Sequence, residues 1–596
     1  MPEVAVTAPM HGTVESVEVA EGDTVAKGGP LVLLESMKMQ HVIEAPAAGI
    51  VRRLAVRPGD TVAEGEEVAV LEEAAEQTGT AAPTAGPDLE RVRPDLEDVL
   101  RRHAIGLDAA RPESVRRRHD RGARTARENI EDLCDPGSFT EYGALVIAAQ
   151  RRRRPVEDLI ERTPADGLVA GVGDIDGRPA MVLSYDYTVL AGTQGVMNHA
   201  KKDRMFELAA RRRIPVVLFA EGGGGRPGDT DTPMISGLDT MAFHLFARLS
   251  GRVPLIGIAA GRCFAGNAAL LGCCDVIIAT EDANIGMGGP AMIEGGGLGV
   301  FAPEEIGPLP VQVRNGVVDL PVRDEAEAVR VARRYLSYFR DVAGEEWSAG
   351  DQRVLRHLIP EDRKRVYDVR SVIEALADTG SVLELRAGFG TGIITVLARI
   401  EGRAVGLVAS NPGHLGGAID ADAADKAARF LQLCDGHGLP VVSLCDTPGF
   451  MVGPAAEETA TVRHFSRLFV AGAGLRVPIC MVILRKAYGL GAQAMAGGSL
   501  KVPVFTVAWP TGEVGGMGLE GAVRLGFRKE LEAAADPEAL FDELVAAAYE
   551  QGKALNAATV YELDDVIDPA DTRRWITTAL RDAPEPAERS RFIDTW

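Results

Sequence analysis

The chain has 596 residues, enough for three or four domains, and a formal net charge of −22 at pH 7, which argues against nucleic acid as a partner. It has no run of 18 or more apolar residues and begins without a basic segment followed by an apolar one, so we expect no membrane span and no secretory signal. The seven cysteines are an odd number and lack metal-ligand spacing, which predicts reduced thiols in a cytoplasmic protein and no metal site.

Residues 1–74 contain two copies of one β unit. Three dipeptides of the first copy return 37 residues later: Ala8-Pro9 as Ala45-Pro46, Gly22-Asp23 as Gly59-Asp60, and Leu34-Glu35 as Leu71-Glu72. Gly-Asp pairs between alternating valine and polar residues indicate turns between short strands. The repeat therefore predicts a small all-β domain in which the two copies close on each other.

The string Glu35-Ser36-Met37-Lys38-Met39 stands at the join of the two copies, on a predicted hairpin. Methionine is usually buried as a flexible gap-filler, so a pair of them around an exposed lysine indicates recognition by another protein. The string resembles the attachment signature of biotinyl/lipoyl carrier domains, Ala/Glu-Met-Lys-Met. That resemblance implies biotin attached to Lys38 by a biotin protein ligase, with Met37 and Met39 as part of the recognised site. The alternative is a plain surface lysine.

Residues 75–90 are rich in Ala, Thr, Gly, Pro and Glu. Such a composition buries too little apolar surface to fold, and it predicts a flexible tether between domains. A mere domain boundary would have the same composition.

Residues 90–135 are predicted to be helical and contain many arginines, which meet phosphates or form a solvated helix face. The strings 119–128 and 133–139 resemble the start of the carboxyltransferase (β) subunits of acyl-CoA carboxylases. Those subunits read roughly His-Lys-Arg-Gly-Lys-Leu-Thr-Ala-Arg-Glu and Leu-Asp-Pro-Gly-Ser-Phe. From this point the resemblance continues to the end of the chain.

A second repeat has a spacing of 225 residues. Ile214-Pro215-Val216-Val217 returns as Leu439-Pro440-Val441-Val442, Glu221 as Asp446, and Gly266 as Gly491. Apolar strands alternating with helices predict buried sheets in an α/β fold. The repeat implies two similar domains, 91–345 and 346–596. The resemblance implies that both are crotonase-like, the first for acyl-CoA and the second for biotin.

Two glycine-rich loops, Gly261 to Asn267 and Lys486 to Ala492, each precede a small-residue helix. Main-chain N–H groups at such a helix start can stabilise an oxyanion. The family strings are Gly-Pro-Cys-Ala-Gly-Gly-Ala and Lys-Ala-Tyr-Gly-Gly-Ala-Tyr. The resemblance implies that Ala265 and Gly266 hold the acyl-CoA enolate, and that Leu490 and Gly491 hold the ureido oxygen of biotin. For either loop alone, a structural turn is the alternative.

A further glycine run precedes both of these loops in the sequence and bears on the substrate. The family reads Asp-Ser-Gly-Gly-Ala-Arg beside its CoA site where this chain has Glu221 to Arg226, which assigns Gly223, Gly224, Gly225 and Arg226 to acyl-CoA binding. Gln493 stands where propionyl- and acetyl-CoA carboxylases usually have Asp. The acyl chain is therefore acetyl, propionyl or longer.

The resemblance implies that carboxybiotin delivers CO2 to the α-carbon of an acyl-CoA through an enolate, inside a homo-oligomer that is a hexamer of stacked dimers. The sequence has no P-loop. We therefore expect a separate, ATP-dependent biotin carboxylase subunit that lacks a carrier. Two alternatives stay open: the carboxyltransferase component of a transcarboxylase or decarboxylase, and a non-catalytic biotin carrier scaffold with decayed oxyanion holes.

Overall fold

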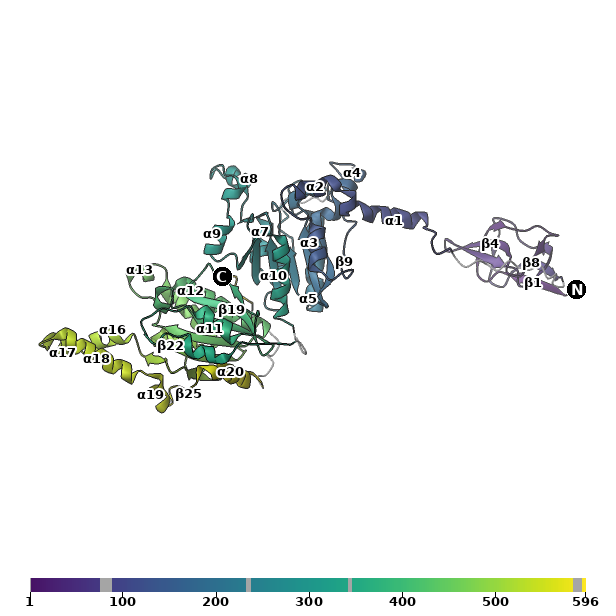
Figure 1. The fold of residues 1–596 in the computed structure, drawn as a ribbon. Helices are drawn as coiled ribbons and strands as arrows, with labels where there is room; N and C mark the ends of the chain where they lie inside the picture. The colour runs from purple at the N-terminus through teal and green to yellow at the C-terminus, as the bar shows by residue number, and fades with distance from the viewer. Residues whose placement is uncertain (1, 75–87, 232–236, 341–345, 582–591) are drawn as a thin grey trace. The chain divides into compact units, whose positions relative to one another are not determined.

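The structure, a computed structural model, describes residues 2–74, 88–231, 237–340, 346–581 and 592–596 (Figure 1). The chain divides into two compact units, Met1–Arg93 and Pro94–Trp596. Residues 75–87 of the predicted tether lie outside the described residues. In the part of the chain that the structure describes, no helix combines the length and the apolar character needed to cross a bilayer.

The first unit consists of two four-stranded sheets with the strand orders β1-β8-β6-β3 and β5-β4-β2-β7. The strands are β1 Glu3–Thr7, β2 Gly12–Val17, β3 Thr24–Val25, β4 Pro30–Ser36, β5 Met39–Glu44, β6 Gly49–Leu54, β7 Thr61–Val62 and β8 Glu67–Glu73. Each sheet takes strands from both copies of the 37-residue repeat. Inward-facing residues such as Leu31, Leu34, Val68 and Leu71 form one core between the sheets. The predicted closure of one copy on the other is confirmed.

The first half of the second unit contains a seven-stranded sheet of order β17-β15-β13-β12-β11-β10-β9. The strands are β9 Thr140–Glu141, β10 Leu168–Ile175, β11 Arg178–Tyr185, β12 Val216–Phe219, β13 Leu255–Ala259, β15 Val276–Thr280 and β17 Leu320–Val322. From β11 to β17 the neighbours are parallel. A parallel pair, β14 Arg262–Phe264 and β16 Asn284–Gly286, forms a separate small sheet.

Ten α-helices accompany this sheet among the described residues. They are α1 Pro94–Ile105, α2 Pro112–His119, α3 Ala126–Leu133, α4 Val156–Arg162, α5 Val196–Arg212, α6 Ala242–Ala247, α7 Gly266–Gly272, α8 Pro290–Gly295, α9 Leu309–Arg314 and α10 Glu325–Ser337. The prediction of helices within residues 90–135 is confirmed. α3 begins with a capping box, in which Thr125 and Glu128 satisfy each other's backbone amides.

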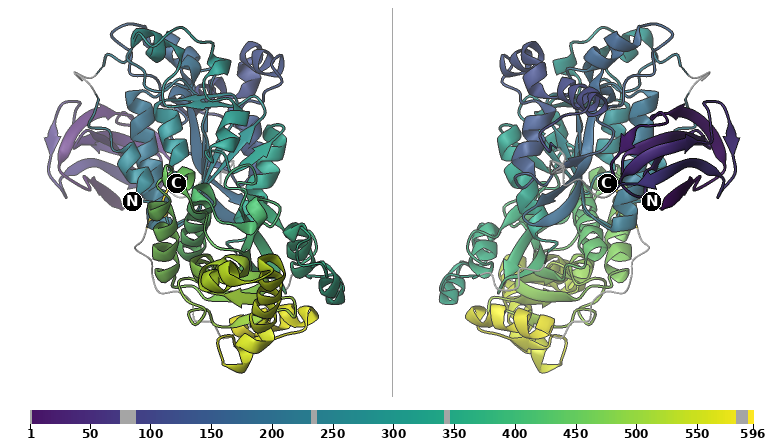
Figure 2. Two further views of the ribbon diagram at one scale, coloured as in Figure 1. Left: turned by 90° about the vertical axis from the view of Figure 1, so that its left-hand side faces the viewer. Right: turned by 90° about the vertical axis from the view of Figure 1, so that its right-hand side faces the viewer.

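The remaining residues form a second large sheet of order β18-β19-β20-β21-β22-β23-β25, with β24 paired to β22. The strands are β18 Leu383–Leu385, β19 Ile393–Ile400, β20 Arg403–Ser410, β21 Val441–Thr447, β22 Ile479–Tyr488, β23 Thr506–Ala508, β24 Glu513–Gly515 and β25 Asp565–Val566. The helices are α11 Val369–Leu376, α12 Ala421–His437, α13 Pro454–Glu457, α14 Thr461–Ala473, α15 Gly489–Met495, α16 Leu519–Gly526, α17 Arg528–Ala533, α18 Pro537–Gln551, α19 Ala554–Thr559 and α20 Thr572–Arg581. Helices α16 to α18 project from this half in Figure 1, and Figure 2 shows the yellow C-terminal part of the chain at its lower end.

The 225-residue repeat is a structural duplication. Elements β10, β11 and α5 return as β19, β20 and α12, each displaced by 225 residues at both ends. The parallel order β11-β12-β13 likewise returns as β20-β21-β22. Equivalent residues of the two halves therefore occupy equivalent places, which is what the two glycine-rich loops require.

One apolar core joins the two halves. It contains Ile256 and Ile278 of the first sheet, Ala424 and Ala428 of α12, and Met481 of the second sheet. The small alanine side chains let α12 pack closely against its neighbours. Buried polar contacts cross the same seam: Arg386 Nε lies 2.9 Å from Asp319 Oδ1, and Arg429 Nη2 donates to the carbonyl of Asp275 at 2.5 Å.

Candidate active site

Lys38 lies at the tip of the β4–β5 hairpin, as the sequence predicts. Ser36 pairs with Met39, so the turn has two residues, Met37 (φ 52°) and Lys38 (φ 65°), as in a type I′ hairpin. Left-handed geometry costs roughly 1–2 kcal/mol per residue outside glycine. The chain thus keeps a strained Met-Lys pair where Asn-Gly would be easier. Met37 is 96% exposed and Met39 65%. Lys38 is exposed at the tip of a two-residue turn, which fits a covalently carried prosthetic group.

In the first half, the glycine run that follows β12 packs against the segment that leads into α7. Gly222 donates to the carbonyl of Arg262 at 2.7 Å and accepts from the amide of Phe264 at 2.9 Å. Gly224 has φ +89°, and a Cβ on it would lie 2.6 Å from the Cβ of Ala265. Two groups of residues that the sequence analysis named separately, the substrate-binding glycines and the first helix start, therefore lie together.

The amides of Ala265 and Gly266 are not equivalent. Ala265 has φ 50° and ψ −120°, a region that glycine favours, and its amide donates to the carbonyl of Gly286 at 3.0 Å. Gly266 is the first residue of α7, so no intrahelical acceptor exists for its amide, and the described residues offer it none. Gly266 is thus the open donor of the predicted pair, whereas a ligand would have to compete for the amide of Ala265.

Arg226 is an internal side chain. Its Nη2 lies 2.6 Å from Asp166 Oδ1 and its Nε 2.8 Å from Asp229 Oδ1, while its backbone amide donates to the carbonyl of Gln194 at 2.9 Å. Burial raises the pKa of Asp166 to about 6, although Arg226 favours the carboxylate. With these pairs formed, Arg226 fixes the end of the glycine run, and its predicted contact with substrate stays a prediction.

Asn267 is a site residue that the sequence analysis missed. It is fully buried, accepts from the amide of Gly224 at 3.1 Å, and donates to the carbonyls of Gly192 and Glu221, both at 3.3 Å. The sequence held one signal for it, because asparagine stands where the family string has alanine. The contacts make Asn267 the link between the glycine run and α7.

A buried polar chain lies beneath the same helix start. Lys202 Nζ and Gln194 Nε2 each lie 3.0 Å from the hydroxyl of Tyr185. Burial lowers the pKa of Lys202 to about 7 and raises that of Tyr185. A Cβ on Gly266 would lie 2.9 Å from Gln194 Oε1. The chain therefore runs from a buried lysine to the side of Gly266.

In the second half, β22 leads directly into α15. Gly489 begins the helix with φ +56°, and Leu490 and Gly491 follow as its second and third residues. Amides in the first turn have no intrahelical acceptor, and the described residues supply none to these two. A Cβ on Gly491 would lie 2.7 Å from the Cα of Gly449, so the helix start is packed on the loop after β21. Gln493 is exposed on the same helix.

Asp446 braces this second helix start. It is completely buried at the end of β21 and accepts hydrogen bonds from Arg485 Nε (3.1 Å), the hydroxyl of Tyr367 (3.0 Å) and the amide of Lys486 (3.1 Å). Lys486 Nζ donates to the carbonyl of Gly416 at 2.6 Å. The carboxylate fixes the path of β22 at Lys486, three residues before α15 begins.

Two helix starts with open amides lie at matching points of a duplicated α/β fold, and the same chain exposes a lysine at the tip of a β hairpin. This combination is the one predicted for a biotin-type carboxyltransferase with its own carrier. Residues 117–592 match the carboxyl transferase domain family, and residues 4–71 match the domain family of biotin-requiring enzymes. The chain belongs to the carboxyl transferase family. The predicted fold class, the biotin requirement and enzymatic carboxyl transfer are confirmed.

Three known proteins show the extent of the similarity. A single-chain, multi-domain long-chain acyl-CoA carboxylase is 60% identical with a TM-score of 0.78 over 97% of this chain, which spans 56% of that protein's chain. The methylmalonyl-CoA carboxyltransferase 12S subunit of Propionibacterium freudenreichii subsp. shermanii is 37% identical over 78% of this chain and 90% of the subunit. A crystal structure of transcarboxylase 12S, a hexamer with methylmalonyl-coenzyme A bound, is 33% identical with a TM-score of 0.73 over 85% of this chain and 100% of that one.

Proposed function

We propose that the protein transfers a carboxyl group from biotin attached to Lys38 to the α-carbon of an acyl-CoA, as the carboxyltransferase and carrier component of an acyl-CoA carboxylase. The observation that carries this proposal is the pair of helix starts, Gly266 on α7 and Leu490-Gly491 on α15, whose amides lack acceptors among the described residues. These two sites match the two oxygens that become negatively charged in such a reaction, the thioester oxygen of the acyl-CoA and the ureido oxygen of biotin.

The first helix start serves the acyl-CoA. The amide of Gly266 donates to the thioester oxygen, and the neighbouring glycine run lets the ligand approach the main chain closely. Each well-aimed donor is worth roughly a hundred- to a thousandfold in rate, because it stabilises charge that appears only as the enolate forms. Asn267 and Gln194 keep the donor and the glycine run in register.

The second helix start serves the carrier. Biotin, when bound, supplies the carboxyl group. The amides of Leu490 and Gly491 hold its ureido oxygen, and the exposed side chain of Leu490 stands next to these donors. The Met37-Lys38 turn fits such delivery because its backbone is fixed while the lysine stem is free to swing.

The acyl chain is proposed to include long chains. Support comes from the 60% identical long-chain acyl-CoA carboxylase and from Gln493, which is exposed on α15 where an Asp is usual in short-chain enzymes. A neutral amide at this place lacks the charge that would repel an apolar chain from the site.

Four further proposals concern the protein's surroundings. A biotin carboxylase activity supplies the carboxyl group, and a biotin protein ligase modifies Lys38. The 12S crystal structure, described as a hexamer, supports a homo-oligomer of that size. The cytoplasm is the proposed compartment, because all seven cysteines, each within the described residues, are free thiols.

The test is a transfer assay with biotinylated protein, a biotin carboxylase, ATP, labelled bicarbonate and acyl-CoAs of increasing length. Labelled carboxyacyl-CoA is expected with the wild type and neither with Lys38→Arg nor with Gly491→Val. Turnover that survives in Gly491→Val would overturn the role of the second helix start, and turnover that never appears would favour the scaffold alternative.

The similarity to the methylmalonyl-CoA carboxyltransferase 12S subunit favours a second candidate, transfer between two organic substrates. This reaction needs neither ATP nor bicarbonate. Incubation of the biotinylated protein with methylmalonyl-CoA alone, followed by measurement of carboxyl groups on the carrier, separates the donors. Faster loading from methylmalonyl-CoA than from the ATP-dependent carboxylase would select the second candidate.

A further inference from the structure

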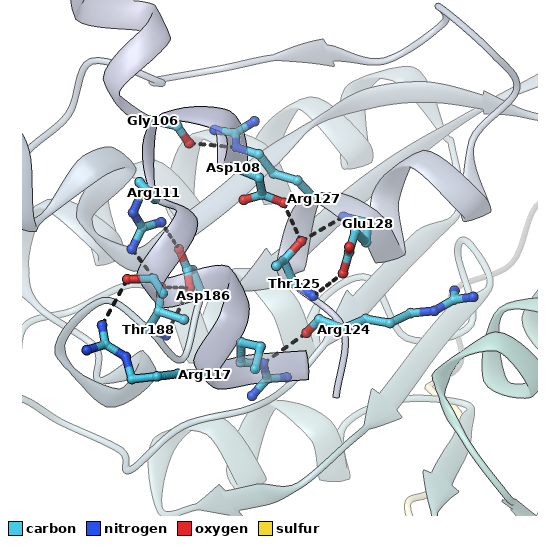
Figure 3. Close-up of polar contacts among 12 residues, drawn as sticks. Gly106, Asp108, Arg111, Arg117, Arg124, Thr125, Arg127, Glu128, Asp186 and Thr188 are labelled. Atoms are coloured by element: carbon cyan, nitrogen blue, oxygen red, sulfur yellow. Dashed lines mark hydrogen bonds and ion pairs between the residues drawn. The ribbon is translucent and has the colours of Figure 1, made fainter. Parts of the chain in front are cut away.

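Helix α2 is anchored at the carboxyl ends of two strands of the first sheet, where the glycine run after β12 begins. Arg118 Nη1 lies 2.8 Å from Glu221 Oε1, and Glu221 directly precedes the glycine run. Arg111 Nη1 lies 2.6 Å from Asp186 Oδ2, just after β11, and Figure 3 shows its guanidinium turned toward Asp186 and Thr188. β11 and β12 are parallel neighbours, so both anchors hold α2 at the carboxyl ends of these strands, where α/β sheets bind ligands.

Three arginines of this region form no ion pair with any described residue. Residues 111–124 contain six arginines and two carboxylates. Arg111, Arg118 and Arg124 are paired with carboxylates. The other three are exposed, and no ion pair joins them to any described residue: Arg116, Arg117 and Arg121. Arg117 reaches only the hydroxyl of Ser114 at 3.1 Å, and Figure 3 shows its guanidinium away from any carboxylate drawn.

The two carboxylates of the segment, Glu113 and Asp120, are also exposed, so the segment keeps a net positive charge. This charge stands beside the glycine run in a chain whose net charge is −22. A local positive field of this kind raises the concentration of a polyanion at the site. The planar guanidinium pairs with phosphate oxygens in a bidentate manner, as it does with carboxylates. Several adjacent arginines favour a ligand that carries several negative charges, such as a nucleotide with more than one phosphate.

We propose that Arg116, Arg117 and Arg121 bind the phosphates of the nucleotide part of coenzyme A while the glycine run and Gly266 hold the thioester. The long pantetheine arm separates these two ends of the molecule, so one ligand spans from α2 to the start of α7. This inference rests on the proposed function, since it assigns the second end of the same substrate.

The first test measures binding without turnover. Adenosine 3′,5′-bisphosphate, the phosphorylated nucleotide alone, is titrated calorimetrically into the full-length protein. Arg116→Gln/Arg117→Gln is expected to weaken binding tenfold or more and to flatten its dependence on salt. The control Arg212→Gln/Arg252→Gln removes two exposed arginines that form no ion pair with any described residue. They precede β12 and β13 and so lie at the amino ends of the strands, opposite to α2. It is expected to bind as the wild type does.

The second test compares acyl-CoA with the same acyl group on pantetheine, which has no nucleotide. The double variant is expected to raise KM for acyl-CoA tenfold or more at unchanged kcat, and to leave KM for the pantetheine thioester unchanged. An equal loss with both substrates, or undiminished bisphosphate binding, overturns the proposal. If no acyl-CoA is carboxylated at all, the proposed function fails, but calorimetry still decides whether α2 binds the nucleotide.

Discussion

The amide of Gly224 donates to Oδ1 of Asn267 at 3.1 Å, which ties the glycine run after β12 to the first turn of α7. The other end of the same side chain donates to the carbonyls of Gly192, in the 3₁₀ turn Leu190–Gly192, and of Glu221. One buried side-chain amide thus satisfies three backbone groups from two segments, the 3₁₀ turn and the glycine run after β12. It sets the distance between the glycine run and the open amide of Gly266.

Asn267→Leu is expected to lower kcat ten- to a hundredfold and stability by about 1–3 kcal/mol, because three buried backbone groups lose their partner. Asn267→Asp keeps the acceptor for Gly224 but loses both donated hydrogen bonds. Its kcat and its stability are therefore expected to lie between those of the wild type and those of Asn267→Leu. Asn315→Leu, at an exposed asparagine, is the matched control. Urea unfolding and initial rates with acyl-CoA provide the two measurements. A stability loss with undiminished kcat would reduce Asn267 to a structural residue.

Gly491→Ala is expected to lower the transfer rate roughly a hundred- to a thousandfold. The added Cβ would lie 2.7 Å from the Cα of Gly449, and because backbone cannot rotate away, the start of α15 must shift. The control is Gly272→Ala at the end of α7, where no atom lies within 4 Å of the new Cβ. Rates are measured at saturating acyl-CoA with the biotinylated chain. Equal rates for the two variants would argue that the position of α15 is irrelevant to catalysis.

The sequence predicts the sheets because each repeat is a pattern of strand-forming and turn-forming residues that can be recognised from neighbouring positions alone. Glycine turns and alternating valines recur at 37 residues in the carrier, and β-branched strands recur at 225 residues in the larger unit. Such patterns fix which residues are strands and which are turns, and the hairpin at Lys38 follows from them. The roles of individual side chains depend on tertiary contacts and are less accessible.

Arg226 illustrates that limit. In the sequence it follows a glycine run and matches a substrate-side arginine, but the fold brings Asp166 from sixty residues away to pair with it. Ala265 is similar, since only the path of β16 places the carbonyl of Gly286 against its amide. No local pattern contains either partner, so only the structure distinguishes the open amide of Gly266 from the occupied one.

Lys38→Arg is expected to abolish biotin attachment and transfer without changing stability, because the side chain is exposed and an arginine keeps its charge. Lys27→Arg, at another exposed lysine of the same unit, should leave both intact. Intact-mass measurement reports attachment, and thermal unfolding reports stability. Biotin found on the Lys38→Arg chain would place the carrier site elsewhere.

Lys202 gives a prediction about pH. Burial lowers its pKa from 10.5 to about 7, so between these values the unfolded chain binds a proton that the folded chain has released. Stability rises with pH wherever the unfolded state binds more protons. The loss of folding stability caused by burying Lys202 is therefore greatest below pH 7 and decreases toward zero as the pH approaches 10.5. Lys202→Met lacks this penalty, so its advantage over the wild type is expected to be largest near pH 7 and to shrink by pH 10.

The measurement is the free energy of unfolding in urea at pH 7, 8, 9 and 10 for both proteins. Lys201 and Lys426, whose pKa values burial also lowers, to about 8 and about 7, are present in both, so their effects cancel in the difference. The titratable groups near Lys202 are Asp203, Asp166 and His199, and these too are shared. Lys364→Met, at an exposed lysine, is the control and is expected to track the wild type. A difference of constant size across the range would mean that Lys202 stays protonated in the folded protein.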